Sequence, residues 1–186
     1  CVIIPDVGDD NGNVRHVGPI VREVSAGRDI LRKQFGFEKS TILLSVGGTD
    51  AGRHLIENAV EAHRKLQNRL NSELVIVSGP SLSLPDSPGY RNLGFVDNMH
   101  ELVYAADLVI SLAGRSTMDE SMVYGTPGIF IPIKGHFEQE DGAARLGYKY
   151  EDIFRLEQLI EEKIGRRAGE VNTGGAALAA KIIAAL

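Results

Sequence analysis

LVISLAGRSTMDESMVYGTPGIFIPIKGHFEQ, residues 108–139, is the stretch that decides the fold. The apolar run Leu108–Leu112 predicts a buried strand, and a glycine-bearing loop and a helical segment with Glu120 follow it. A second apolar run, Gly128–Ile133, predicts the next strand and leads into a polar loop at 136–139. This order predicts a parallel α/β sheet, in which the loops after the strands meet at one edge. We therefore expect the polar groups of these loops to converge on one crevice.

Strand and helix patterns alternate through the rest of the chain as well. TILLSV at 41–46 has the length and apolar content of a buried strand, and a helix with one apolar face follows it to Leu70. The further elements predicted are a helix ending near Gly36, strands at 74–78 and 91–95, helices at 99–105 and 138–146, a short edge strand at 148–150, and helices at 155–164 and 176–186. The fold class predicted is α/β, a Rossmann-like, doubly wound parallel sheet.

Length and composition bound the domain organisation. The chain has 186 residues, 43% of them hydrophobic, which suffices for the core of one domain with an appendage. The opening run CVIIPD looks like a strand cut partway through, and the start without Met favours a piece of a longer protein. Residues 7–18 carry Gly, Asn and Asp without periodicity, as a loop or linker does. We expect residues 1–16 to end a preceding N-terminal domain and its linker, and residues 17–186 to form the C-terminal domain.

Charge and hydropathy argue against several classes of function. The net charge of −5 argues against a nucleic-acid partner. The basic clusters at 64–69 and 163–167 fit solvated helix faces, and Asp97, Glu101 and Asp107 fit helix ends or surface charges. No apolar stretch approaches the roughly 20 residues that span a bilayer, and the start lacks the pattern of a secretory signal, so we expect a cytoplasmic protein. No cluster of His, Cys and Asp has metal-ligand spacing, so neither a metal nor another cofactor is predicted.

Two strand-to-helix loops carry glycines and hydroxyl groups. Gly47-Gly48-Thr49 follows the first buried strand, where glycines let the backbone approach an anion at the start of the next helix. Gly114-Arg115-Ser116-Thr117 repeats the arrangement after a later strand, and together the two loops suit a diphosphate. The alternative for the first loop is a tight turn capped by Thr49 or Asp50. The alternative for the second is ordinary N-capping, with Thr117 and Glu120 forming a capping box.

Further polar groups could hold the rest of a sugar nucleotide. Glu120 lies about one turn into its predicted helix, where a carboxylate can accept hydrogen bonds from both hydroxyls of a ribose. Glu138 and Gln139 open the next helix, and a carboxylate with an amide can hold several sugar hydroxyls. His136 is either a donor to phosphate or a loop residue.

Five short motifs stand at the ends of the predicted strands and helices. They are SVGGT at 45–49, GFVDNM at 94–99, AGRSTMDE at 113–120, GTP at 125–127 and HFEQE at 136–140. Together they resemble the C-terminal donor-binding domain of GT-B glycosyltransferases. The similarity runs from about residue 17 to residue 186 and favours the MurG-like branch, of the glycosyltransferase family 28 C-terminal type, with its bacterial and archaeal UDP-N-acetylglucosamine transferases. The resemblance implies one half of a GT-B fold.

The resemblance also implies a role for each part of the site. The diphosphate would lie against Arg22, Gly48, Thr49, Gly114, Ser116 and Thr117, the uracil and ribose against Phe95, Val96, Met99 and Glu120, and the transferred sugar against His136, Glu138 and Gln139. Two departures bear on the branch and on the sugar. Leu112 stands where plant and animal relatives have His, and Glu138 stands where MurG-like enzymes often have Gln.

By this resemblance, the chain is the donor-binding half of an inverting glycosyltransferase that moves a hexosyl group, N-acetylglucosamine, from a UDP-sugar to an acceptor hydroxyl. Helix dipoles would take the place of a metal ion. The missing N-terminal domain would supply the general base and any contact with a membrane or with a lipid-linked or small glycoside acceptor, so the fragment would bind donor without turnover. Three alternatives stay open: a UDP-sugar hydrolase of the same fold, a separate donor-binding subunit that requires a partner chain, and a nucleotide-sensing module.

Overall fold

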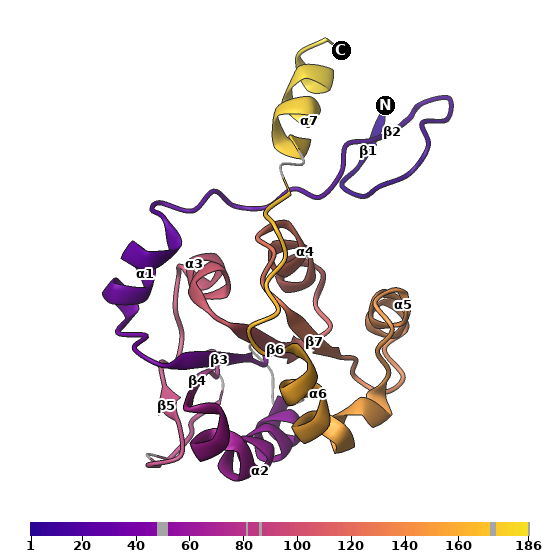
Figure 1. The fold of residues 1–186 in the computed structure, drawn as a ribbon. Coiled ribbons are helices and arrows are strands. Elements are labelled where there is room, and N and C mark those ends of the chain that lie inside the picture. Colours follow the sequence, from indigo (N-terminus) through magenta and orange to yellow (C-terminus); the bar gives the residue numbers. More distant parts are fainter. Residues whose placement is uncertain (48–51, 81, 86, 172–173, 186) are drawn as a thin grey trace.

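A parallel five-stranded sheet with helices on both faces forms the centre of the molecule (Figure 1). The structure is a computed structural model that describes residues 1–47, 52–80, 82–85, 87–171 and 174–185. In spatial order, the strands of the sheet are β5 (Arg91–Asn92), β4 (Ser72–Val77), β3 (Ser40–Ser45), β6 (Leu108–Leu112) and β7 (Gly128–Ile131). The predicted fold class, an α/β doubly wound parallel sheet, is confirmed.

The order of the strands places the switch point of the sheet between β3 and β6. Leu43 of β3 pairs with Val75 of β4 on one side and with Val109 of β6 on the other. From β3 the chain runs outward through β4 to β5, and it then returns to β6 and continues outward to β7. The loops after β3 and β6 therefore lead away in opposite directions. In sheets of this kind, the crevice between two such loops is where ligands bind.

Helices cover the two faces of the sheet (Figure 1). One face is covered by α2 (Arg53–Leu70), the 3-10 helix η2 (Tyr150–Arg155) and α6 (Leu156–Lys163), and the other by α1 (Arg28–Phe35) and α3 (Met99–Ala105). Helix α4 (Arg115–Val123) follows β6, and α5 (Phe137–Arg145) follows β7. These two helices carry several of the predicted site residues, Glu120 in α4 and Glu138 and Gln139 in α5.

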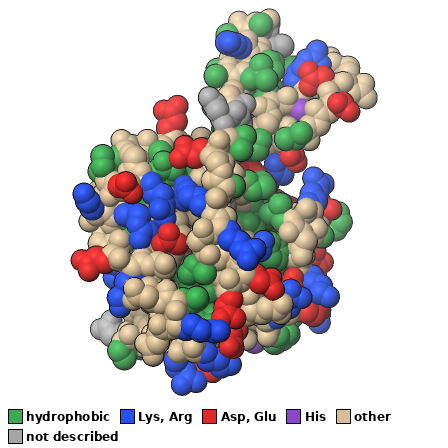
Figure 2. All heavy atoms as spheres, viewed as in Figure 1, with side chains coloured by type: hydrophobic (Ala, Val, Ile, Leu, Met, Phe, Trp, Pro, Cys, Tyr) green, Lys and Arg blue, Asp and Glu red, His purple; other side chains and the backbone are tan. Residues whose placement is uncertain are grey.

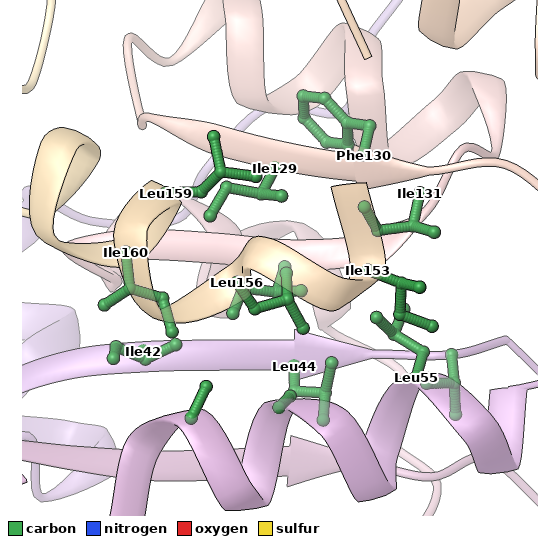
Figure 3. Close-up of a cluster of buried hydrophobic side chains, with 14 of the residues drawn as sticks. Ile42, Leu44, Leu55, Ile129, Phe130, Ile131, Ile153, Leu156, Leu159 and Ile160 are labelled. Carbon is green, nitrogen blue, oxygen red and sulfur yellow. The ribbon is translucent and has the colours of Figure 1, made fainter. Parts of the chain in front are cut away.

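The strands are apolar on both sides because both sides are covered. Ile42 and Leu44 of β3 belong to a buried cluster with side chains of β7, α2, η2 and α6 (Figure 3). Leu43, between them in sequence, belongs to a second buried cluster under α1 and α3. Successive side chains of a strand point to opposite faces, so a continuous apolar run suits a strand between two helical layers.

A small ribbon and the last helix lie away from the sheet (Figure 1). The ribbon consists of β1 (Val2–Ile4) and β2 (Val14–His16), which pair in parallel, and the last helix is α7 (Gly175–Ala184). The prediction of an aperiodic loop over 7–18 is therefore wrong for the part that forms β2, because β1 supplies a hydrogen-bonding neighbour. Arg115 ties the ribbon to α4, since its guanidinium donates to the carboxylate of Asp6 and to the carbonyl of Pro5, each at 3.1 Å.

The segment after α5 also differs from its prediction. The expected edge strand at 148–150 is wrong, and α6 begins one residue later than expected. Tyr148 is buried, its hydroxyl donates to the carbonyl of Gly128 at 2.5 Å, and its ring packs edge-on against Phe130. The amide of Lys149 donates to the carboxylate of Asp152 at 2.9 Å, which starts the 3-10 helix. The chain thus turns into a helix where a strand was expected.

Charged side chains of both signs are interspersed on the face seen in Figure 2. The basic cluster at 64–69 lies on the exposed side of α2, as predicted. The prediction of a solvated helix face is wrong for Arg167, which follows α6 and is partly buried. Its guanidinium donates to the carbonyl of Tyr124 at 2.7 Å and lies over the ring of Tyr104. Within the described residues, none of the helices has the length and apolar content needed to cross a membrane.

Candidate functional site

The first of the two glycine loops follows β3 at the switch point. Gly47 has a φ of 68°, a left-handed conformation that glycine adopts without strain. Gly48 and Thr49, the two residues of this loop expected at the diphosphate, lie outside the described residues. Their placement at the phosphate stays a prediction.

The second glycine loop leads from β6 directly into α4. Gly114 is the N-cap residue of α4, and Ser116 and Thr117 lie in its first turn. The alternative interpretation, ordinary N-capping with a capping box of Thr117 and Glu120, is wrong, because the helix starts at Arg115 and no side chain caps it. The two hydroxyls therefore do not occupy the capping position. The first amides of a helix have no partner within it, so this exposed turn can receive an anion.

Glu120 lies one turn further along α4 and is almost fully buried. Its relative exposure is 4%, and burial raises the pKa of its carboxyl group. Arg22 counteracts that shift, because its Nε donates to Oε1 of Glu120 at 3.2 Å. The structure thus pairs two predicted site residues that are 98 positions apart in the sequence.

The loop between β5 and α3 meets the same guanidinium. Nη1 of Arg22 donates to the carbonyl of Asp97 at 3.2 Å. Val96 and Met99 pack against the buried cluster under α1 and α3, whereas the side chain of Phe95 is exposed. Arg22 therefore bridges Glu120, where the ribose was expected, and the carbonyl of Asp97, which directly follows Phe95 and Val96, where the uracil was expected.

The backbone around Arg22 is held by residues that the sequence analysis did not assign to the site. The hydroxyl of Tyr124 donates to the carbonyl of Arg22 at 2.6 Å. The backbone amide and the hydroxyl of Ser25 both donate to Glu101, whose pKa is lowered mainly by the hydroxyl. Glu101 lies in the first turn of α3, as a helix-end charge does, but it is not a surface charge, since the residue is only 7% exposed. No local pattern marks these contacts, because each joins residues far apart in the sequence.

The third loop, between β7 and α5, orders its polar groups around its own backbone. His136 is the N-cap residue of α5, and its Nδ1 accepts from the amide of Gln139 at 3.4 Å. The amide oxygen of Gln139 in turn accepts from the amide of Ile133 at 3.0 Å. Glu138 is exposed at the start of the helix. Of the three, Glu138 is therefore the one whose side chain faces solvent without a backbone-ordering role in this loop.

A cavity of about 240 Å³ connects the second and third loops. Ala113 and Arg115 line it from the start of α4, and Phe137, Glu138 and Asp141 line it from α5. Arg115 also donates to Asp119 at 2.7 Å, and both this carboxylate and that of Asp6 raise its pKa. Of the residues predicted to bind the sugar, Glu138 lines this cavity, and Ala113 and Arg115, which flank Gly114, line it from the side of the predicted phosphate loop.

The model of a known protein family matches most of this chain. Residues 42–184 match the model described as glycosyltransferase family 28 C-terminal domain. The chain belongs to this family. The described residues of this family 28 domain contain no group of three His, Cys, Asp or Glu side chains that could hold a metal ion.

Relatives of the family 28 domain carry glycosyltransferase names. An uncharacterized glycosyltransferase of Methanopyrus kandleri is 31% identical over 157 residues, which cover 78% of this chain and 45% of that protein. A protein of Thermosipho africanus, named UDP-N-acetylglucosamine–N-acetylmuramyl-(pentapeptide) pyrophosphoryl-undecaprenol N-acetylglucosamine transferase, is 32% identical over 176 residues, or 86% of this chain and 51% of that protein. The chain thus spans about half the length of these relatives.

Solved structures share the fold of the family 28 domain. A calicheamicin glycosyltransferase superposes on 95% of this chain and 49% of its own, with a TM-score of 0.63 and 14% identity. A spinosyn rhamnosyltransferase complexed with thymidine diphosphate covers 93% of this chain and 48% of its own, with a TM-score of 0.57 and 19% identity. At these identities the similarity concerns the fold, one half of the GT-B architecture.

The GTP motif of the family 28 domain holds the scaffold together. The hydroxyl of Thr126 donates to the carbonyl of Val103 at 2.9 Å, and the hydroxyl of Ser121 donates to the carbonyl of Thr126 at 2.6 Å. Gly125 has a φ of 70°, and a Cβ there would lie 2.3 Å from the carbonyl oxygen of Ala168. This motif fixes the turn between α4 and β7, and thereby the helix that carries Glu120.

Proposed function

We propose that this family 28 domain binds the nucleotide and sugar of a UDP-sugar, N-acetylglucosamine being the sugar, for transfer to an acceptor hydroxyl. The observation that carries the proposal is the buried carboxylate of Glu120 in the helix that follows the switch point, linked through Arg22 to the carbonyl of Asp97. A buried carboxylate is stable only with good hydrogen-bond partners, and the two hydroxyls of a ribose supply them. The names of relatives such as the Thermosipho africanus transferase support the choice of donor.

The diphosphate would lie at the start of α4. Backbone amides of the first turn and the hydroxyls of Ser116 and Thr117 face an anion there, with Gly114 allowing close approach and Gly48 and Thr49 completing the cradle. As the sugar leaves in an inverting displacement, negative charge grows on the diphosphate. Preorganised amides at a helix start stabilise that charge without a metal ion.

The transferred sugar would lie in the cavity between α4 and α5. Glu138 lines that cavity, and His136 and Gln139 shape the loop beside it. The acceptor and the general base would come from a preceding N-terminal domain, which we place before residue 17. In this proposal, that domain also makes any contact with a membrane or a lipid-linked acceptor, on the cytoplasmic side.

Calorimetric titration tests the proposal most directly. UDP-N-acetylglucosamine, UDP and 2′-deoxy-UDP would be titrated into the chain and into Glu120→Ala, with Glu38→Ala, an exposed glutamate before β3, as the matched control. Two hydrogen bonds to a charged, buried carboxylate, at about 1.5–3 kcal/mol each, predict a loss of affinity of about 100-fold or more in Glu120→Ala.

The deoxynucleotide sharpens the test. Wild type and the control should prefer UDP over 2′-deoxy-UDP, and Glu120→Ala should lose this preference, because the missing hydroxyl is one that Glu120 would bind. Failure of the wild-type chain to bind UDP at millimolar concentration, or an unchanged preference in Glu120→Ala, would contradict the proposal.

A further inference from the structure

We propose that Arg22 occupies the nucleoside-binding groups of the free domain, that the ribose displaces it, and that its guanidinium then moves to the diphosphate. The guanidinium of Arg22 would thus leave the carboxylate of Glu120 and bind the phosphates instead. This inference rests on the proposed function and adds the order of events at the same site.

The contacts of Arg22 span the proposed nucleoside site. Its Nε is 3.2 Å from Glu120 Oε1, and its Nη1 is 3.2 Å from the carbonyl oxygen of Asp97. These are the carboxylate proposed for the ribose and a carbonyl directly after Phe95 and Val96, the residues expected at the uracil. A nucleoside that binds both would take the place of the guanidinium, so the two cannot occupy the site together.

Arg22 is held weakly enough to leave. Its side chain is 51% exposed, and both of its hydrogen bonds are at the long end of the usual range. Glu120, in contrast, is buried and gains from any donor that neutralises or hydrates its carboxylate. The free domain therefore pairs a buried anion with a replaceable cation.

The backbone of Arg22 stays in place while the side chain moves. Tyr124 holds its carbonyl, and three residues further on Ser25 is fastened to Glu101. Ser116 and Thr117 precede Glu120 by four and three residues on the same helix, which is about 4.5–6 Å along the helix axis. A guanidinium on a flexible three-carbon stem covers such a distance by rotating about its side-chain bonds. Its planar fork also matches phosphate geometry better than an ammonium group does.

The exchange predicts effects of opposite sign for two ligands. Removal of Arg22 should help uridine, which only competes with the guanidinium, and should harm UDP, which also gains the phosphate contact. Since a half-exposed ion pair is weak, we expect uridine to bind about 2- to 5-fold more tightly to Arg22→Ala. UDP should bind about 5- to 10-fold more weakly, since the lost charge-assisted contact outweighs the relief of competition.

Titration of the full chain with uridine and with UDP measures both effects. The variants are Arg22→Ala, Arg22→Lys and the control Arg64→Ala, which removes an exposed arginine of α2. Arg22→Lys keeps the charge without the fork, so it should restore part of the UDP affinity. As a second readout in wild type, the Nε–Hε NMR signal of Arg22, assigned by its loss in Arg22→Lys, should shift on addition of uridine.

Three results would overturn the exchange. If Arg22→Ala weakens uridine and UDP alike, Arg22 supports the nucleoside site instead of blocking it. If Arg22→Ala changes neither affinity while wild type binds UDP, the exchange is wrong although the proposed function stands. If wild type binds neither uridine nor UDP at millimolar concentration, the proposed function fails and the exchange fails with it.

Discussion

Replacement of Asp107 by alanine tests the charged cluster that fastens α1 to the sheet. The carboxylate of Asp107 accepts from Arg28 Nη2 at 2.6 Å, from Arg32 Nη1 at 2.8 Å and from the amide of Thr41 at 2.8 Å. The side chains of the three charged residues are 17–26% exposed. One carboxylate just before β6 thus holds two residues of α1 and the backbone of β3.

The size of the effect follows from these contacts. Hydrogen bonds between charged groups contribute about 1.5–3 kcal/mol each when buried, and partial exposure reduces them here to about 1 kcal/mol for each arginine. Thr41 is fully buried, and leaving its amide without an acceptor costs about 1–2 kcal/mol more. We therefore expect Asp107→Ala to lower the free energy of unfolding by about 3–4 kcal/mol. Asp107→Asn keeps one neutral acceptor and should lose about half of that.

Urea unfolding followed by circular dichroism measures these differences. The matched control is Asp141→Ala, because Asp141 makes an exposed ion pair with Arg145 within α5. The control should stay within about 0.5 kcal/mol of wild type. A loss below about 1 kcal/mol in Asp107→Ala would refute the reasoning, since the cluster would then contribute no more than an exposed pair.

Three further predictions concern the scaffold. Gly125→Ala should lower the free energy of unfolding by about 2–4 kcal/mol in urea titrations, because it adds backbone strain and a clash with the Ala168 carbonyl; an unchanged midpoint would count against that close approach. Burial lowers the pKa of His63 below its usual 6.5, so below about pH 6.5 the unfolded chain takes up a proton that the folded protein resists, and the free energy of unfolding falls. Wild type should therefore lose more stability than His63→Leu between pH 7.5 and 5.5, and equal losses would contradict this. Leu31→Ala should lower the free energy of unfolding by about 2–5 kcal/mol, since Leu31 is fully buried on the inner side of α1. Ile30→Ala, on the exposed side of the same helix, should change it little in the same titration.

The regular alternation of the fold could be predicted from the sequence because it is a local pattern. The helix at 99–105 and the strand at 108–112 have the predicted bounds, and the helix ending near Gly36 ends there. The 3-10 helix after Tyr148 and the strand at 14–16 could not be predicted in this way. Strand β2 depends on the neighbouring strand β1, and the turn into the 3-10 helix combines the local bond between Lys149 and Asp152 with a distant one, from Tyr148 to the carbonyl of Gly128.

The charged residues show the same limit more sharply. Glu101 and Asp107 look like helix-end or surface charges in the sequence, and Arg167 looks like part of a solvated helix face. Glu101 does lie at the start of α3, but all three side chains are partly or fully buried with specific partners. A charge in a helix pattern is most often solvated, so the local interpretation follows the common case. Partners 66 to 79 positions away decide the actual environment of Asp107, and nothing within one turn of the residue indicates them.

The candidate site depends both on local patterns and on contacts between distant residues. Its candidate residues could be chosen from their places after the strands, whereas their contacts with one another could not. Glu120 follows β6 and the 95–97 loop follows β5, so topology brings both to the carboxyl edge of the sheet. Topology does not say that the buried carboxylate of Glu120 needs a counterion in the free domain, nor that Arg22 supplies it. The burial that makes a carboxylate selective for two ribose hydroxyls also makes it costly to leave unpaired. In the proposed exchange, a residue that would bind the leaving diphosphate is a suitable temporary partner, because the ligand that displaces it from the carboxylate would bring the phosphates that it binds next.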